Sequence, residues 1–272
     1  MPLSILLGAA AGAAGLAWSL FEAQWVELVE RDVAIPDLAP ELAGFRILHL
    51  SDFHLGTASL NGRALGRALA WAERGNVDLV AITGDLVSRR RGEKALREAL
   101  ARLQARHGIF AVLGNHDVAS TRDPFSRPAR LSNLGEDGAR LLEHAAAEVG
   151  VRGRTVQVVG ADPRRRADSL EALADPEADL RILLVHFPDE VRRVRPGAFH
   201  LVLAGHLHGG QICLPTPRGK LRLEHLTAAY WEGVFELPGG VLHVSRGLGT
   251  SFVPFRLLAR PEATILTLRA RH

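Results

Sequence analysis

Short apolar runs that end at a glycine, aspartate, asparagine or histidine constrain the fold of this chain more than any other feature. Runs of this length, bounded by turn-forming residues, predict buried strands. The expected strands span Phe45–Leu50, Asp78–Thr83, Ile109–Leu113, Thr155–Val159, Arg181–His186, His200–Ala204, Val241–Ser245 and Thr264–Leu268. A further strand is expected within Glu22–Ala34, where apolar and polar residues alternate.

Two segments between these runs carry apolar residues at helical spacing. Helices are expected over Gly62–Arg74 and Glu93–Arg106, and in the second the leucines fall on one face with charges opposite. Strands that alternate with helices predict an α/β fold in which helices cover a sheet. The segment Ala119–Gly138 is polar and rich in proline, serine and arginine, so we expect a long loop there.

Composition bounds the class of protein. The 272 residues are 47% hydrophobic and 23% charged, which is typical of a folded globular chain. This length suits one large α/β domain or two small ones. A net charge of +3 is too small to predict a nucleic-acid partner, although the balance tolerates a phosphate-bearing substrate. The single cysteine, Cys213, excludes an internal disulfide and a thiolate-rich zinc site, and we expect it to pack as a small hydrophobe.

The N-terminus is unlike the rest of the chain because Leu3 to Phe21 contains no charged residue. That length is close to the roughly 20 residues that a helix needs to cross a bilayer. Trp18 and Trp25 stand near one end of it, where interfacial aromatic residues lie. A membrane anchor, a cleaved signal peptide and a buried or flexible soluble helix all fit the pattern. No Lys or Arg precedes Leu3, which weakens the signal-peptide interpretation and leaves topology open.

We therefore expect a hydrophobic anchor or signal segment over residues 1–22 and one folded α/β domain over residues 23–272. The expected location is the cell membrane, with export after signal cleavage as the alternative.

Polar residues follow the predicted strands at the carboxyl ends, where sites of open α/β sheets assemble. Alone, each of these motifs has an ordinary explanation as a turn, a helix cap or a surface histidine. In this order, each at a strand end, they are improbable as a coincidence. The candidate metal ligands are Asp52, His54, Asp85, Asn115, His186, His206 and His208, and His116 stands beside them.

Imidazole and carboxylate ligands without a thiolate favour manganese, iron or zinc over copper(I) or an iron–sulfur cluster. Seven candidate ligands exceed what one ion requires, and a carboxylate shared between two ions would use them all.

The order D-x-H, G-D, G-N-H-D, H, G-H-x-H resembles the signature of the calcineurin-like metallophosphoesterases, from about Phe45 to the C-terminus. The stretch G-H-L-H-G-G-Q and the later Ser245–Thr250 resemble a bacterial branch that is often membrane-associated or exported. That branch includes phosphodiesterases similar to the enzyme that hydrolyses UDP-2,3-diacylglucosamine in lipid A synthesis.

The resemblance implies a four-layer sandwich of two β-sheets flanked by helices, and two divalent metal ions, preferably Mn²⁺ with Zn²⁺ or iron as alternatives. It also implies roles for the site residues. Asp52, His54 and His208 would hold the first ion; Asn115, His186 and His206 would hold the second; Asp85 would bridge them; and His116 would act as a catalytic acid. A hydroxide between two ions about 3.5–4 Å apart would attack phosphorus.

One position departs from the family pattern. Many members carry an aspartate that orients the catalytic histidine where this chain has Ser88. Asp117, next to His116, is a candidate replacement. Arg246 is a candidate phosphate contact. Solvated or packed roles are preferred for Arg164–Arg166, Trp231 and Phe252.

The leading hypothesis is a dinuclear phosphodiesterase or pyrophosphatase that acts on a lipid- or nucleotide-linked phosphoester. A nuclease is the alternative enzyme, ranked lower because no basic stripe with interleaved aromatic residues is present. A metal-bound scaffold without catalysis is the non-enzymatic alternative. The oligomeric state stays open.

Overall fold

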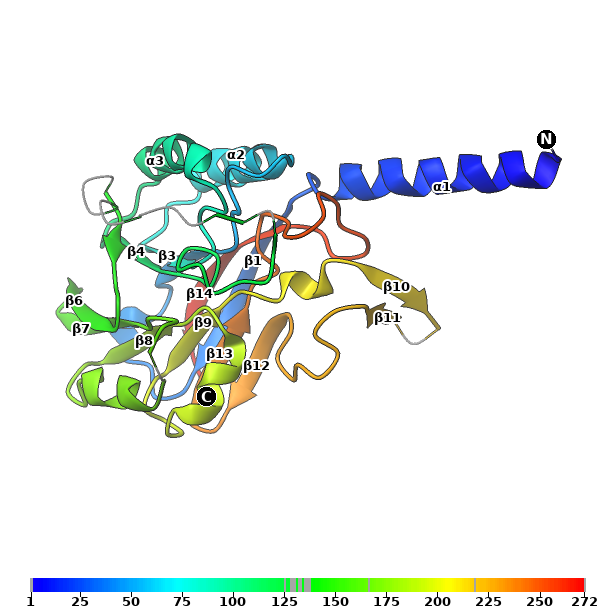
Figure 1. The fold of residues 1–272 in the computed structure, drawn as a ribbon. Coiled ribbons are helices and arrows are strands. Elements are labelled where there is room, and N and C mark those ends of the chain that lie inside the picture. The colour runs from blue at the N-terminus through cyan, green and yellow to red at the C-terminus, as the bar shows by residue number, and fades with distance from the viewer. Residues whose placement is uncertain are drawn as a thin grey trace.

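The fold is that of a computed structural model, which describes residues 2–124, 126–127, 131, 134, 138–165, 167–217 and 219–271. Two six-stranded sheets pack face to face, and one long helix projects from the body (Figure 1). Outside the sheets, the α-helices are α1 (Leu3–Glu22), α2 (Asn61–Ala72) and α3 (Glu93–Arg102). The 3₁₀ helices are η1 (Pro40–Leu42), η2 (Arg90–Gly92), η3 (Ala167–Leu173), η4 (Pro188–Arg193) and η5 (His208–Gly210).

The first sheet has the strand order β1-β14-β2-β3-β4-β5. Its strands are β1 (Glu27–Ile35), β14 (Glu262–Ala270), β2 (Arg46–Leu50), β3 (Leu79–Thr83), β4 (Ile109–Val112) and β5 (Arg140–Leu141). The run from β2 to β5 is parallel, whereas β14 is antiparallel to β2. The carboxyl ends of β2, β3 and β4 therefore lie at one edge.

The second sheet has the order β12-β13-β9-β8-β7-β6. Its strands are β12 (Gly233–Leu237), β13 (Gly240–Val244), β9 (Leu201–Ala204), β8 (Leu180–Leu184), β7 (Arg154–Gly160) and β6 (Ala145–Val151). The four central strands are parallel. A separate antiparallel hairpin joins β10 (Cys213–Thr216) to β11 (Gly219–Arg222).

Alternation along the strands builds the layers. Leu48 and Val80 pack with the helices on the outer face of the first sheet, and Ile47 and Leu79 pack between the sheets. On the far side, Leu183 packs with residues of η3 and η4. The expected four-layer α/β sandwich is confirmed, with 3₁₀ helices forming one of its outer layers.

Most expected elements are present with small shifts at their ends. The helix expected over Glu93–Arg106 ends at Arg102 because Leu103 adopts an extended backbone conformation and packs into the core. The hairpin and strands β5, β6 and β12 were not expected. In the expected loop Ala119–Gly138 the described residues form no helix or strand, and residues 125, 128–130, 132–133 and 135–137 lie outside the described chain.

The last turn of α1 packs on the body, although most of the helix is exposed. The backbone N–H of Arg256 donates to Ser19 O at 3.1 Å, and the Ala259 N–H donates to Glu22 Oε1 at 2.8 Å. Ser19, Glu22 and Ala23 are buried there. The helix is long and apolar enough to span a membrane over Ser4–Glu22, a property that signal sequences share. The division at residue 22 stays a prediction, and these contacts bind the end of the helix to the body.

Candidate metal centre

The predicted site residues converge where the carboxyl ends of β2, β3 and β4 meet those of β8 and β9. Asp52 and His54 follow β2, Asp85 follows β3, and Asn115 and His116 follow β4. His186 follows β8, and His206 and His208 follow β9. The site thus forms at the junction of the two sheets, with ligands supplied by both.

Five of these residues have a positive φ, which is uncommon for residues other than glycine. They are Asp52 (53°), His54 (46°), Asp85 (53°), His206 (77°) and His208 (49°). Strained backbone of this kind clusters at functional sites.

The glycines of the motifs permit the close approach of these loops. A Cβ on Gly114 would lie 2.1 Å from Asp85 Oδ1, and one on Gly205 would lie 2.4 Å from Asp52 Oδ2. Any side chain at either position would displace a carboxylate of the site.

Asp52, His54 and His208 form the first group of potential ligands. His208 Nε2 lies 3.5 Å from Asp52 Oδ1 and 3.1 Å from His54 Nε2. The other ring nitrogens are engaged, because His54 Nδ1 lies 2.9 Å from Ser88 Oγ and His208 Nδ1 lies 3.3 Å from Gly249 O. Both Nε2 atoms therefore face the same small volume.

Asp85, His186 and His206 form the second group, with Asn115 beside them. His186 Nε2 lies 2.9 Å from Asn115 Oδ1, 3.1 Å from His206 Nδ1 and 3.3 Å from Asp85 Oδ2. Asp85 also reaches the first group, since its Oδ2 lies 3.4 Å from His54 Nε2. One carboxylate thus contacts both groups.

The donor set fits divalent cations. His186 Nδ1 lies 2.9 Å from Thr83 O, a carbonyl that can only accept, so Nδ1 carries the proton. In the neutral ring, Nε2 therefore carries a lone pair. That lone pair faces the oxygens of Asp85 and Asn115, which are also acceptors. Acceptors that face one another need a cation between them. Oxygen and imidazole ligands of this kind suit manganese, zinc or iron.

Electrostatics leads to the same conclusion. Burial opposes a charge on His186, but the Asp85 carboxylate outweighs it and raises the pKa of His186 to about 10. Burial would also raise the pKa of Asp85, yet the surrounding histidines hold it well below its usual range. The site therefore favours positive charge at this point, and a divalent ion would take the place of the proton.

Burial keeps the remaining histidines neutral, as metal ligation requires. It lowers the pKa of His54 to about 3 and the pKa values of His206 and His208 well below their usual range. Burial, with Asp85 nearby, raises the pKa of Asp52 to about 6. Two carboxylates in one buried site repel each other, and bound cations would relieve this repulsion.

His116 lies beside the ligands with one nitrogen open. Its backbone N–H donates to Asp85 Oδ1 at 2.9 Å, and its Nε2 lies 3.1 Å from Thr121 Oγ1. The ring packs edge-on against His54, with centroids 4.5 Å apart. Within the described chain, the buried Nδ1 has no hydrogen-bond partner. An unpaired buried nitrogen suits a group that meets a substrate atom.

The residues considered for orienting His116 have other partners. Ser88 contacts His54 instead. The carboxylate of Asp117 accepts the backbone N–H groups of Leu86, Val87 and Gly114, so it joins the loops after β3 and β4. The side chain that hydrogen-bonds the His116 ring is Thr121, which no sequence pattern marked.

Arg256 is another residue that the sequence did not mark. Its guanidinium is fully buried and donates to the carbonyls of His208, Gly249, Ala259 and Arg246. Burial lowers its pKa to about 9. Its position fixes the loop that carries His208.

Arg246, the predicted phosphate contact, lies outside the histidine cluster. Its guanidinium bonds Glu27 Oε2 and Glu262 Oε2, each at 2.8 Å. That pairing weighs against a phosphate role, which stays a prediction. Arg164 pairs with Asp162 and Glu143 on the surface, and Arg166 lies outside the described residues.

Two other minor expectations can be located in the structure. Cys213 is buried, as expected. Trp231 lies beneath the cationic groups of Lys220 and Arg222.

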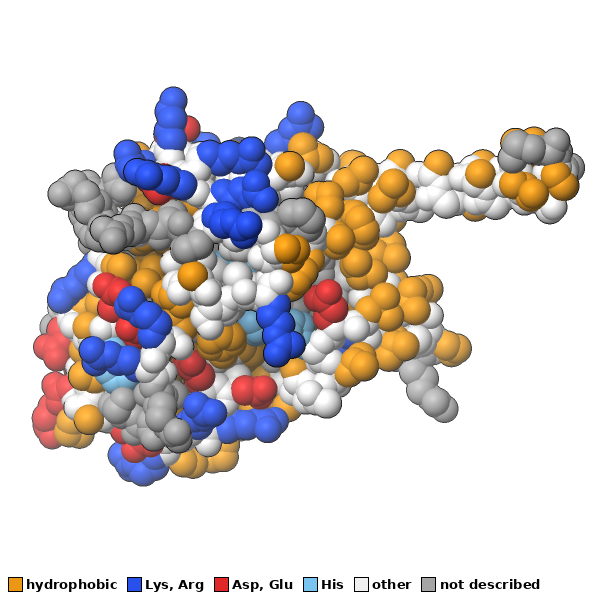
Figure 2. Space-filling model, in the orientation of Figure 1, with side chains coloured by type: hydrophobic (Ala, Val, Ile, Leu, Met, Phe, Trp, Pro, Cys, Tyr) orange, Lys and Arg blue, Asp and Glu red, His pale blue; other side chains and the backbone are white. Residues whose placement is uncertain are grey.

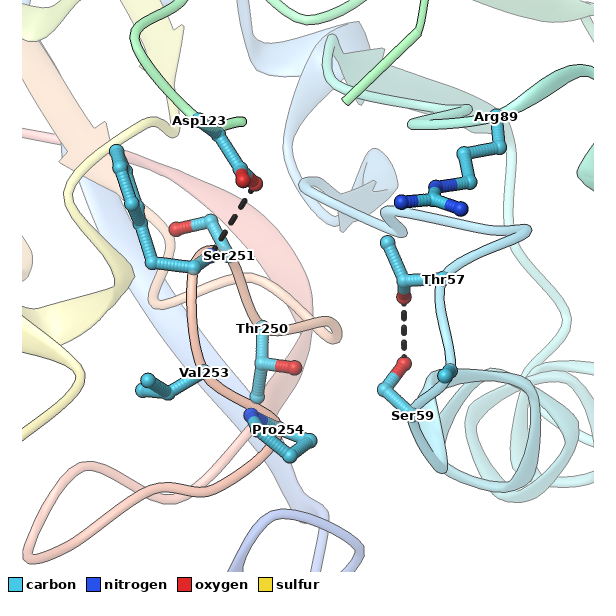
Figure 3. A pocket seen from close by; sticks show the side chains of 10 residues that line it. Thr57, Ser59, Arg89, Asp123, Thr250, Ser251, Val253 and Pro254 are labelled. Atoms are coloured by element: carbon cyan, nitrogen blue, oxygen red, sulfur yellow. Dashed lines mark hydrogen bonds between the residues drawn. The ribbon is translucent and has the colours of Figure 1, made fainter. Parts of the chain in front are cut away.

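A cavity of about 210 Å³ adjoins the site (Figure 3). Thr57 and Ser59 form one wall and residues 250–254 the other, with Arg89 and Asp123 at its edge. The residues that line the cavity lie close in the chain to residues of the site. Thr57 Oγ1 donates to His54 O at 3.1 Å, and Asp123 N–H donates to the Thr121 hydroxyl that contacts His116.

Comparison with known proteins bears on this arrangement. The sequence model of the calcineurin-like phosphoesterases matches residues 45–210. The uncharacterized metallophosphoesterase YkoQ of Bacillus subtilis is 29% identical over 234 residues, which cover 84% of this chain and 85% of the relative. The UDP-2,3-diacylglucosamine pyrophosphatase LpxG of Chlamydia trachomatis is 27% identical, covering 85% and 86%. The phosphodiesterase YaeI of Escherichia coli is 28% identical, covering 91% and 90%.

Proposed function

Because the chain belongs to the calcineurin-like phosphoesterase family, we propose that it hydrolyses a phosphodiester or pyrophosphate bond with two divalent metal ions. Family membership makes it a metal-dependent phosphoric ester hydrolase, with relatives named as a phosphodiesterase and a pyrophosphatase. The observation that carries the dinuclear proposal is the position of Asp85, whose carboxylate contacts both groups of potential ligands.

In this proposal Asp52, His54 and His208 would hold one ion, and Asp85 would be shared. Asn115, His186 and His206 would hold the second ion. The hydrogen bond of His186 Nδ1 to Thr83 O fixes the tautomer that directs the Nε2 lone pair of His186 inward. The set combines imidazoles with oxygen donors and lacks sulfur, so Mn²⁺, Zn²⁺ or iron would fit it, and we propose Mn²⁺ as the ion to test first.

The ions, when bound, would activate water and neutralise charge that develops on the phosphoryl oxygens. His116 then acts on the leaving group. Within the described chain its Nδ1 is unpaired, and its backbone N–H donates to Asp85, so the ring is held beside the metal ligands. Burial lowers the pKa of His116, and the Asp85 carboxylate opposes this shift. When protonated, His116 would donate to the leaving oxygen as the phosphorus–oxygen bond breaks, and a positioned acid contributes about 10²–10⁴-fold.

The cavity beside the site suits a substrate with an apolar part. Phe252, Val253 and Pro254 supply an apolar wall. On the opposite side, the hydroxyls of Thr57 and Ser59 hydrogen-bond each other at 2.7 Å (Figure 3). We assign this cavity to the organic portion of a lipid- or nucleotide-linked phosphoester. The substrate named for LpxG, UDP-2,3-diacylglucosamine, has both a nucleotide part and a lipid part.

We also propose that α1 holds the protein at a membrane. Twenty residues at 1.5 Å per residue span about 30 Å, the thickness of a bilayer core. Its large apolar side chains, such as Leu7 at 62% exposure, have no place to pack within the described chain.

The test is hydrolysis of bis(4-nitrophenyl) phosphate by the full chain in detergent, with Mn²⁺ or with chelator. We expect turnover that requires metal and is lost in Asp85→Asn and Asn115→Ala. A UDP-linked lipid pyrophosphate should then be hydrolysed faster than single-stranded DNA. Turnover that survives chelation would refute the metal mechanism, and preference for DNA would favour the nuclease.

A further inference from the structure

Among the described residues, the large exposed apolar side chains fall in three segments of the chain. They lie between residues 5 and 28, 214 and 226, or 252 and 258. Figure 2 shows these surfaces gathered around the base of α1 and on the hairpin β10–β11. Scattered apolar residues are ordinary, whereas a concentrated patch marks an interaction surface.

These segments adjoin one another. Trp18 and Trp25 from the end of α1, Pro215 from the hairpin, and Leu258 line one cavity. The Lys220 ammonium donates to Leu258 O at 3.1 Å, and the Cys213 N–H donates to Leu257 O at 2.9 Å. We define the collar as the exposed side chains of this region: Trp18, Trp25, Leu214, Leu221, Leu223 and Leu258.

Two leucines of the hairpin are exposed, so they contribute little packing energy against the body. Leu214 and Leu221 are cross-strand partners, exposed by 42% and 50% respectively. The hairpin belongs to neither large sheet, and a free two-stranded hairpin is only marginally stable in water. An apolar environment against these leucines would stabilise it.

Basic side chains surround the point where α1 meets the body. Arg260 stacks over Trp25 at 4.0 Å, and Arg63 and Arg67 both donate to Gln24. Lys220 also lines the collar cavity, and its ammonium pairs with Glu232 at 2.9 Å. Tryptophan and arginine together at the end of an apolar helix match the headgroup level of a bilayer, where cations meet lipid phosphates.

We propose that the collar docks the catalytic body directly on an anionic bilayer surface, in addition to the hold that α1 provides. This inference rests on the proposed membrane role of α1. A bilayer is the occupant because the collar is continuous with a helix of bilayer length and is bordered by lipid-compatible cations. Loop 250–258 joins the collar to the cavity beside the metal centre, so docking brings that cavity close to the lipid surface.

Fluorescence quenching in the full chain tests the proposal. Cys213 is replaced by alanine, and a single environment-sensitive label is attached at Leu221→Cys in the collar. Leu7→Cys reports on α1, and Lys94→Cys, whose side chain is 87% exposed on α3, reports on the distant surface. Each protein is reconstituted in phosphatidylcholine–phosphatidylglycerol nanodiscs, with nitroxide lipids or aqueous iodide as the quencher.

We expect nitroxide lipids to quench the labels at positions 7 and 221, and iodide to quench the label at position 94. If iodide reaches position 221 as readily as position 94 while position 7 stays in lipid, the collar proposal is wrong and the anchor stands. If positions 7 and 221 are both in water, both proposals fail. A label at 221 that neither quencher reaches would lie within the protein or between copies of it, and would overturn the proposal. Hydrolysis does not enter any readout, so the catalytic proposal is judged separately.

Discussion

Substitution of the buried Arg256 should have two effects: it should lower the stability of the protein and weaken one of the two metal sites. Its guanidinium is the donor for carbonyls of the His208 loop and of the segment that follows β13. In Arg256→Met the side chain keeps a similar length but cannot donate. His208 O and Gly247 O retain a second donor, from the backbones of Gln211 and Glu262 respectively.

The magnitude follows from the carbonyls that lose their donor. Ala259 O and Arg246 O have no other donor within the described chain. A buried unpaired group costs about 1–3 kcal/mol, so two cost about 2–6 kcal/mol. Burial of the methionine and removal of a buried charge offset part of this cost. We expect a net loss of about 3 kcal/mol, which is a fall in Tm of roughly 6–12 °C for a chain of this size.

The assay is thermal unfolding of wild type and variant in chelator, followed by calorimetric titration with Mn²⁺. One of the two metal sites should weaken, because Arg256 fixes the loop that carries His208. Arg260→Met is the matched control, since that arginine is partly exposed and stacks on Trp25. It should cost less than about 1 kcal/mol. Unchanged stability and unchanged metal affinity in Arg256→Met would refute the reasoning.

Other perturbations have distinct expected results. Asp85→Asn should weaken both metal sites in calorimetry, whereas His208→Ala should weaken mainly one; native affinity at both sites in Asp85→Asn would exclude the bridging role. His116→Ala should keep both metals and lose about 10²–10⁴-fold in kcat, most with a poor alkoxide leaving group and least with nitrophenolate. Equal losses on both substrates would mean that His116 stabilises phosphoryl oxygens and is not an acid. Removing residues 2–17 should leave only the weaker, salt-sensitive membrane binding of the collar, with activity kept, and a supernatant location of the intact full-length chain would contradict the anchor. His243 has a pKa of about 4, lowered by burial, against about 6.5 when unfolded. As pH falls, His243 therefore takes up a proton in the unfolded chain before it does so in the folded chain. Roughly 3 kcal/mol of the free energy of unfolding, present above pH 6.5, is lost as pH falls towards 4. Urea midpoints at pH 7 and 5 should differ less in His243→Gln, and an unchanged difference would show that other groups dominate.

The strands and the site motifs could be predicted because their signals are local. An apolar run that ends in Gly84 and Asp85 is visible without knowledge of the rest of the chain. Within each sheet, the convergence of the motifs followed from the rule that parallel strands end at one edge. The meeting of the two sheets at the site is a long-range feature that this rule does not predict.

Long-range features could not be predicted in this way. Strand β1 pairs with β14 across most of the chain, and no local pattern sets that partner. The burial of Arg256 depends on carbonyls from separate segments, so its sequence context resembles that of a surface arginine. Ser88 was recognised as a departure, but its contact with His54 depends on how the two loops meet. The hairpin β10–β11 was missed because its first strand, Cys213–Thr216, contains a proline and no alternation, although Lys220 to Leu223 alternate.

The central claim is that Asp85 joins two metal sites in one centre. Its most direct test is metal content by elemental analysis, measured with kcat as Mn²⁺ is added to chelated protein and free metal is removed. The account predicts saturation at two ions per chain, with activity that appears only as the second ion binds. Saturation at one ion with full activity would contradict it.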